Sequence, residues 1–67
     1  MSNTSAIAFQ QQAAKGASVA RHFMDSANTQ LANGEPVASV NSMKTAASYQ
    51  QKSAAGYEKA RKALDGD

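Results

Sequence analysis

The apolar residues of segment 6–31 fall on one side of a helix, and most of them are small. At 100° per residue they occupy an arc of about 160°, with two glutamines near its edge. Small side chains let a neighbouring backbone approach closely, so the arc predicts tight packing of this helix on another helix. The members of the arc are Ala6, Phe9, Ala13, Gly16, Ala17, Val19, Ala20, Phe23, Met24, Ala27 and Leu31.

Capping and stop signals set the limits of this first helix. Residues 2–5 all carry short side-chain oxygens that can accept from free amides at a helix N-terminus. The run Asn33-Gly34-Glu35-Pro36 is a stop signal, because Gly34 can adopt the left-handed conformation and Pro36 cannot continue the same hydrogen-bond ladder. A helix over about residues 5–32 is therefore expected.

A second, narrower apolar stripe follows this stop. Its members recur at spacings of three, four and seven residues, with Arg61 interrupting the C-terminal end. A second helix is expected over about residues 40–64, after a connection at 33–39. Two starts remain open, because Pro36 suits a first turn whereas Ser39 and Asn41 suit an N-cap. The stripe consists of Val40, Met43, Ala47, Gln50, Ala54, Tyr57 and Leu64, and Tyr57 is expected to be a core residue.

Two helices with a short connection pack antiparallel, so residues 1–67 are expected to form one all-α domain, an antiparallel helical hairpin. A chain of 67 residues seldom gains more than about 3–5 kcal/mol from a single core. Much of the hydrophobic fraction is alanine, and no cysteine is present to form disulfides or thiolate metal sites. Association as a homo-oligomer, or with another helical protein, would bury more surface.

The arc of the first helix is wider than one partner helix covers, and two lines of residues lie within it. We expect the alanine line to meet the second helix and the phenylalanine line to meet another copy, in a four-helix bundle or a larger coiled-coil assembly. The phenylalanine line is Phe9, Gly16 and Phe23. The alanine line is Ala6, Ala13, Ala17, Ala20, Met24, Ala27 and Leu31. With Met43, Ala47, Ala54, Tyr57 and Leu64, these are the candidate helix-packing residues.

Four lysines, Lys44, Lys52, Lys59 and Lys62, fall on the outer arc of the second helix. Such a face can follow a phosphate backbone, with an affinity that depends on salt through counterion release. It contains no arginine fork, Tyr49 is the only aromatic residue beside it, and the net charge is only +2. A solvated helix surface is the favoured interpretation, and nucleic-acid binding is the alternative.

The sequence offers little support for catalysis. His22, the only histidine, lies on the polar face of the first helix, whereas a metal site needs about three or four protein ligands. No two of the five acidic residues lie one helical turn apart, and no glycine-rich phosphate loop is present. We therefore expect no enzymatic activity, no cofactor and no metal, with His22 as an exposed surface residue.

The longest apolar run, Ala6-Ile7-Ala8-Phe9, is far shorter than the ~20 residues of a membrane span. Residues 1–5 show neither the basic segment nor the apolar region of a secretory signal. A cytoplasmic location is the default expectation, and export without a cleaved signal is the alternative.

In overall shape the chain is similar to two classes of helical hairpin. Its length and small seam residues resemble plasmid-encoded RNA-binding hairpins that form dimeric four-helix bundles, although its connection is longer. Its Gly34-Glu35-Pro36 connection and its polar second helix, which contains Gln50 and Gln51, resemble rod and needle subunits of flagellar and type III secretion systems. Neither pattern assigns a family.

The sequence favours a non-enzymatic structural or interaction protein that self-associates through an alanine-rich face. The alternatives are an RNA- or DNA-binding four-helix-bundle regulator and a rod- or needle-like subunit of a secretion-related filament.

Overall fold

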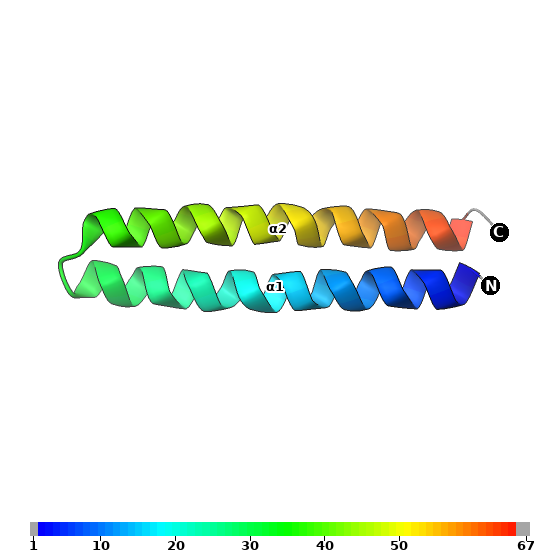
Figure 1. Cartoon of the computed structure of the whole chain (residues 1–67), viewed down its shortest axis with the longest axis horizontal. Coiled ribbons are helices and arrows are strands. Elements are labelled where there is room, and N and C mark those ends of the chain that lie inside the picture. The colour runs from blue at the N-terminus through cyan, green and yellow to red at the C-terminus, as the bar shows by residue number, and fades with distance from the viewer. Residues whose placement is uncertain (1, 66–67) are drawn as a thin grey trace.

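The computed structural model describes residues 2–65, which form two antiparallel helices, α1 (Ser2–Ala32) and α2 (Pro36–Asp65) (Figure 1). The helices lie side by side along a rod whose Cα atoms span 51 × 12 × 9 Å. The predicted all-α hairpin is thus confirmed. The first helix begins at Ser2, three residues before its predicted start.

A glycine in the left-handed conformation ends α1. Gly34 has a φ of 74°, which glycine adopts without steric cost. The Glu35 amide then donates to the Gln30 carbonyl at 2.8 Å, and the Asn33 amide donates to the Thr29 carbonyl at 3.0 Å. The bond from Glu35, one residue beyond the left-handed glycine, is the long-range bond of a Schellman motif. The stop predicted at Gly34 is therefore correct.

The second helix begins immediately after this turn, at Pro36, and not near residue 40. The Ser39 amide donates to the Glu35 carbonyl at 3.0 Å, which closes the first turn of α2 around Pro36. Proline is favoured here because its φ is already helical and its missing N–H would have no partner in the first turn. Of the two starts left open by the sequence, the structure has the one at Pro36.

The core is one line of small residues on each helix. Its members are spaced seven residues apart, as in a coiled coil, and each is at most 9% exposed. On α1 the line is Ala6, Ala13, Ala20 and Ala27, and on α2 it is Ser39, Ala46, Ser53 and Ala60. These four alanines of α1 meet α2 as predicted. Leu31, which the prediction also placed against α2, is 62% exposed, so the prediction is wrong for this member of the alanine line.

Both buried serines in the seam are hydrogen-bonded across it. The Ser39 hydroxyl donates to the Ala27 carbonyl, and the Ser53 hydroxyl donates to the Ala13 carbonyl, each at 2.8 Å. A buried hydroxyl costs free energy unless it is paired, so these bonds fix the helices at a register in which both serines reach a carbonyl.

The stripe predicted for α2 does not form the seam with α1. Val40, Met43, Tyr57 and Leu64 are 45–58% exposed, and the stripe's other members are exposed as well. The buried line lies one residue earlier, at Ser39 and its heptad equivalents. Closely packed backbones leave room only for alanine and serine, so the larger neighbours are excluded from the seam. The prediction that Tyr57 is a core residue is wrong for the same reason.

The phenylalanine line of α1 lies beside the seam with α2. The ring of Phe23 stacks on that of Tyr49, with centroids 6.1 Å apart and planes 8° apart. Gly16 faces α2 beside Tyr49 and Ser53. Phe9, Gly16 and Phe23 therefore flank the intramolecular seam, where they are half-buried, and the expectation that they meet another copy stays a prediction.

Candidate interaction surfaces

Two contacts define the two long sides of the rod. On one side Phe23 stacks on Tyr49. On the other side the Gln50 amide nitrogen contacts the Met24 sulfur at 3.7 Å. Residues seven apart on a helix share a face, so each contact also locates the heptad equivalents of its residues.

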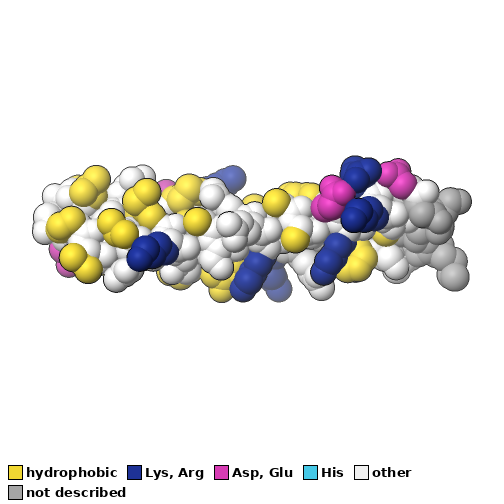
Figure 2. Space-filling view, turned by 90° about the horizontal axis from the view of Figure 1, so that it is seen from above, with side chains coloured by type: hydrophobic (Ala, Val, Ile, Leu, Met, Phe, Trp, Pro, Cys, Tyr) yellow, Lys and Arg dark blue, Asp and Glu magenta, His cyan; other side chains and the backbone are white. Residues whose placement is uncertain are grey.

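The side that carries Met24 and Gln50 is largely apolar. We call it the apolar face, and it joins residues that both helices leave exposed. Its large side chains range from 37% exposed for Met24 to 62% for Leu31. Figure 2 shows hydrophobic side chains spread over the surface of the rod. The apolar residues that define this face are Ile7, Ala14, Ala17, Met24, Leu31, Val40, Met43, Ala47, Ala54, Tyr57 and Leu64. The heptad equivalents Gln10, Arg21, Asn28, Gln50 and Arg61 lie on the same side.

The seam between the helices buries only small side chains, whereas the apolar face leaves large ones exposed. Among the described residues, the fully buried side chains are alanines and serines, and none is large. The chain exposes 4801 Å². A compact monomer of 7.0 kDa would expose roughly 4,000 Å². The excess is on the order of the ~800 Å² that each partner buries in a standard interface.

The predicted packing residues thus separate into three groups. Ala13, Ala20 and Ala27 lie in the seam, and Phe9, Gly16 and Phe23 flank it. The remaining predicted residues belong to the apolar face: Ala17, Met24, Leu31, Met43, Ala47, Ala54, Tyr57 and Leu64.

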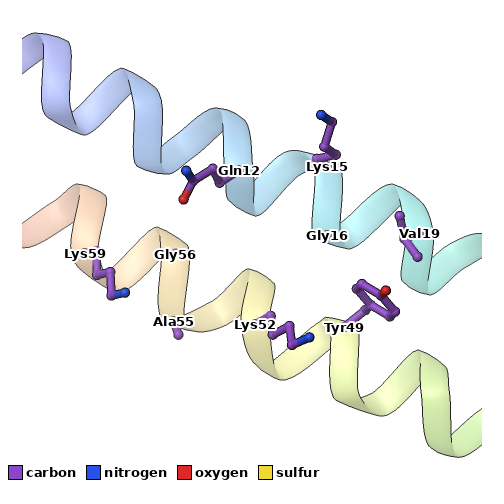
Figure 3. Close-up of a pocket in the computed structure, with 9 residues that line it drawn as sticks. All are labelled: Gln12, Lys15, Gly16, Val19, Tyr49, Lys52, Ala55, Gly56 and Lys59. Carbon is purple, nitrogen blue, oxygen red and sulfur yellow. The ribbon is translucent and has the colours of Figure 1, made fainter.

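The opposite side holds a groove of about 450 Å³ above the helix seam (Figure 3). We call it the basic groove. Val19 and Tyr49 point toward one another between the helices, whereas Lys15 extends from α1 away from α2. The groove is lined by Gln12, Lys15, Gly16, Val19, Tyr49, Lys52, Ala55, Gly56 and Lys59.

The groove brings together only part of the predicted lysine face. Lys52 and Lys59 line it, whereas Lys44 lies in a separate hollow near the turn and Lys62 lines neither. The sequence prediction missed Lys15, which reaches the groove from α1. The sequence feature that could have indicated Lys15 as a groove residue is its position one residue before Gly16, beside the seam. In Figure 2, Lys and Arg side chains project from both edges over the middle of the rod, more of them from one edge than from the other.

A separate charge cluster lies near the end of α2. Arg61 donates to Glu58 and, at 3.0 Å, to Asp65, and all three side chains are exposed. The hydrogen bond from Arg61, and then its positive charge, lower the pKa of Glu58 below its usual range. The same contacts raise the pKa of Arg61. These carboxylates are therefore already occupied by an intrahelical partner.

His22 is exposed and lies in a shallow hollow with Asp25, Ser26, Thr29 and Gln30. Within residues 2–65, no group of three His, Cys, Asp or Glu side chains is arranged to hold a metal ion.

Neither of the two described helices has the length and apolar character needed to cross a membrane.

Comparison with known proteins finds no match, whether to a family model, a curated protein or a solved structure.

Proposed function

We propose that this protein is a non-enzymatic structural or interaction protein whose hairpins associate with one another through the apolar face. One observation carries the proposal. Seven of the eight large apolar side chains that the described hairpin leaves exposed belong to this face, Val37 being the exception. The proposed contact surface therefore differs from the alanine-rich face predicted from the sequence, because the central alanines of that face are already covered by α2.

The distribution of side-chain size supports a pair of hairpins. The large residues gather toward the two ends of the face, and its middle has the small residues Ala14, Ala17, Ala47 and Ala54 together with Arg21 and Gln50. A second copy docked antiparallel would place the turn end of each hairpin on the open end of the other. Such an arrangement is isologous, because the same surface is used twice, and it forms a four-helix bundle.

The energetic balance allows a stable pair. Fully burying one large apolar side chain contributes about 1.5–3 kcal/mol, so covering the exposed halves of seven contributes roughly 5–10 kcal/mol per copy. Two copies contribute this amount twice, against an association cost of about 4–15 kcal/mol. The apolar face is therefore large enough to hold two hairpins together.

Size-exclusion chromatography with light scattering tests this proposal. The wild-type chain is expected at the mass of a dimer. The double variant Leu31→Gln, Met43→Gln should be a monomer, because it places two polar side chains on the apolar face. Val37→Gln, which makes the same change off the face, should remain a dimer.

Other masses would contradict the two-copy bundle. A monomeric wild-type chain, or a dimer that persists in the double variant, would refute association through this face. Large, polydisperse species that the double variant abolishes would favour a filament subunit over the bundle.

A further inference from the structure

We propose that the basic groove binds an acidic amphipathic helix of a partner protein. This surface lies on the side of the rod opposite the apolar face, so the inference is independent of the proposed self-association.

The floor of the groove suits a close-packed helix. Gly16 and Gly56 face the opposite helix and have no side chain, and Val19 adds an apolar wall at one end. Ala55 lies at the rim, where its small side chain points away from α1 (Figure 3). A helix laid along the seam could bring its own apolar side chains down onto this floor. Recognition would then follow the helix-in-groove mode, in which apolar anchors enter a groove between helices.

The rim of the groove supplies positive charge at helical spacing. Lys52 and Lys59 are seven residues apart, or about 10.5 Å along the axis. Their ammonium groups lie 5.0 Å and 5.9 Å from the ring centroids of Tyr49 and Phe9, which places them beside the groove. Lys15 belongs to the opposite rim, but its side chain extends away from α2 (Figure 3), so the charge at the groove comes from Lys52 and Lys59.

These lysines are electrostatically unsatisfied. In the described part of the chain, the ion pairs are those of Arg61 with Glu58 and Asp65. A partner helix with carboxylates seven residues apart would match Lys52 and Lys59. Charge complementarity thus selects an acidic helix over a basic or neutral one.

A second copy of this chain is a poorer occupant. Glu58 and Asp65 have the required spacing, but both are bound to Arg61 and would have to break those contacts. Nucleic acid is also a poorer fit, because one face of the Tyr49 ring is covered by Phe23 and Lys52 lies over the ring. Base stacking on Tyr49 would compete with these two contacts, and a phosphate backbone gains nothing from the apolar floor.

Titration calorimetry at low salt tests the proposal with a synthetic helical peptide. The peptide carries glutamates seven residues apart on both flanks of a leucine–alanine stripe, and a matched peptide has glutamine in place of glutamate. The acidic peptide is expected to bind and the neutral peptide to bind at least about tenfold more weakly, as expected for several exposed ion pairs. Equal affinity for the two peptides would overturn the proposal.

Paired variants locate the binding site. Lys52→Gln with Lys59→Gln should weaken peptide binding about tenfold. Lys44→Gln with Lys62→Gln removes the same charge outside the groove and should leave the affinity nearly unchanged. Equal losses in the two double variants would show general attraction to a basic protein and overturn the groove assignment.

A larger side chain at the rim of the groove distinguishes binding of a helix from binding of a nucleic acid. Ala55 is exposed in the hairpin, so Ala55→Leu should keep the helical circular dichroism while weakening peptide binding. An oligonucleotide that binds more tightly than the peptide, depends on Lys52 and Lys59 and tolerates Ala55→Leu would overturn the proposal in favour of nucleic acid. Light scattering of each variant shows whether the dimer persists, so a failure here is distinguishable from failure of the proposed self-association.

Discussion

Gly16 and Gly56 both face the opposite helix, but their surroundings differ. A Cβ at Gly16 would lie 3.5 Å from the Tyr49 carbonyl oxygen and 3.6 Å from the Ser53 Cβ, which are ordinary contacts. A Cβ at Gly56 would lie 3.0 Å from the Ala13 Cβ and 3.3 Å from its Cα. The backbones therefore approach so closely at Gly56 that a side chain there would force them apart.

This difference predicts opposite outcomes for the same substitution. Gly16→Ala should raise the free energy of unfolding by up to about 1 kcal/mol, because alanine is the better helix former. Gly56→Ala has the same propensity gain but an overpacking cost of about 1–3 kcal/mol, so it should be the less stable variant by at least about 1 kcal/mol. Chemical denaturation at equal chain concentration measures both. Equal stabilities would argue against the close approach of Gly56 and Ala13.

Ser39 and Ser53 show why the seam of α2 could not be predicted from hydropathy. Serine counts as polar, so the stripe was assigned to the larger residues one position further along the helix. In the structure each hydroxyl donates to a backbone carbonyl of α1, which makes serine compatible with burial. The signal that could have found the line is the heptad of small residues shared by both helices.

At the scale of the helices, individual residues that limit the backbone predicted the helix ends better than the apolar periodicity predicted which sides of the helices meet. The end of α1 followed from Gly34 and the N-terminal turn of α2 from Pro36, because both residues act through their own backbone geometry. The four buried alanines of α1 were also predicted to meet α2, since their neighbours are mostly apolar, but Leu31 was wrongly placed with them. The side of α2 that faces α1 could not be predicted from the sequence. It depends on contacts between residues about 40 positions apart, such as Ser53 and Ala13.

The separation of the two helices is set by their small residues, which predicts the effect of enlarging one of them. Ala20 is 1% exposed, so Ala20→Leu should drive the helices apart and lower the free energy of unfolding by about 1–3 kcal/mol. Ala8→Leu, on an exposed position of the same helix, is the matched control and should change it little. Denaturation of both variants at equal chain concentration gives the comparison. A higher denaturation midpoint for Ala20→Leu would contradict the prediction, because it would mean that a leucine fits in the seam without separating the helices.

At the scale of the whole molecule, the hairpin has different surfaces on its two long sides. The apolar face gathers Met24, Leu31 and Met43 from both helices, and the basic groove gathers Lys15 with Lys52 and Lys59. Neither combination is visible in the sequence of one helix, because each requires the register between α1 and α2. The sequence did place most of these residues on helix surfaces, so the missing information was which surfaces adjoin.

The small core predicts that folding and association are coupled. Residues 2–65 fully bury nothing larger than alanine and serine, so much of the stability should come from covering the apolar face. For a folded dimer in equilibrium with unfolded chains, a tenfold rise in concentration adds about 1.4 kcal/mol per dimer, and the melting temperature should rise by about 3–6 °C.

Melting curves from circular dichroism at several chain concentrations measure this shift. Val37→Gln should follow the wild-type curves, because Val37 lies off the apolar face. The Leu31→Gln, Met43→Gln variant should melt at a lower temperature that does not change with concentration. If the wild-type melting temperature is also independent of concentration, the seam of alanines and serines stabilises a lone hairpin by itself, and the exposed apolar face is not needed for folding.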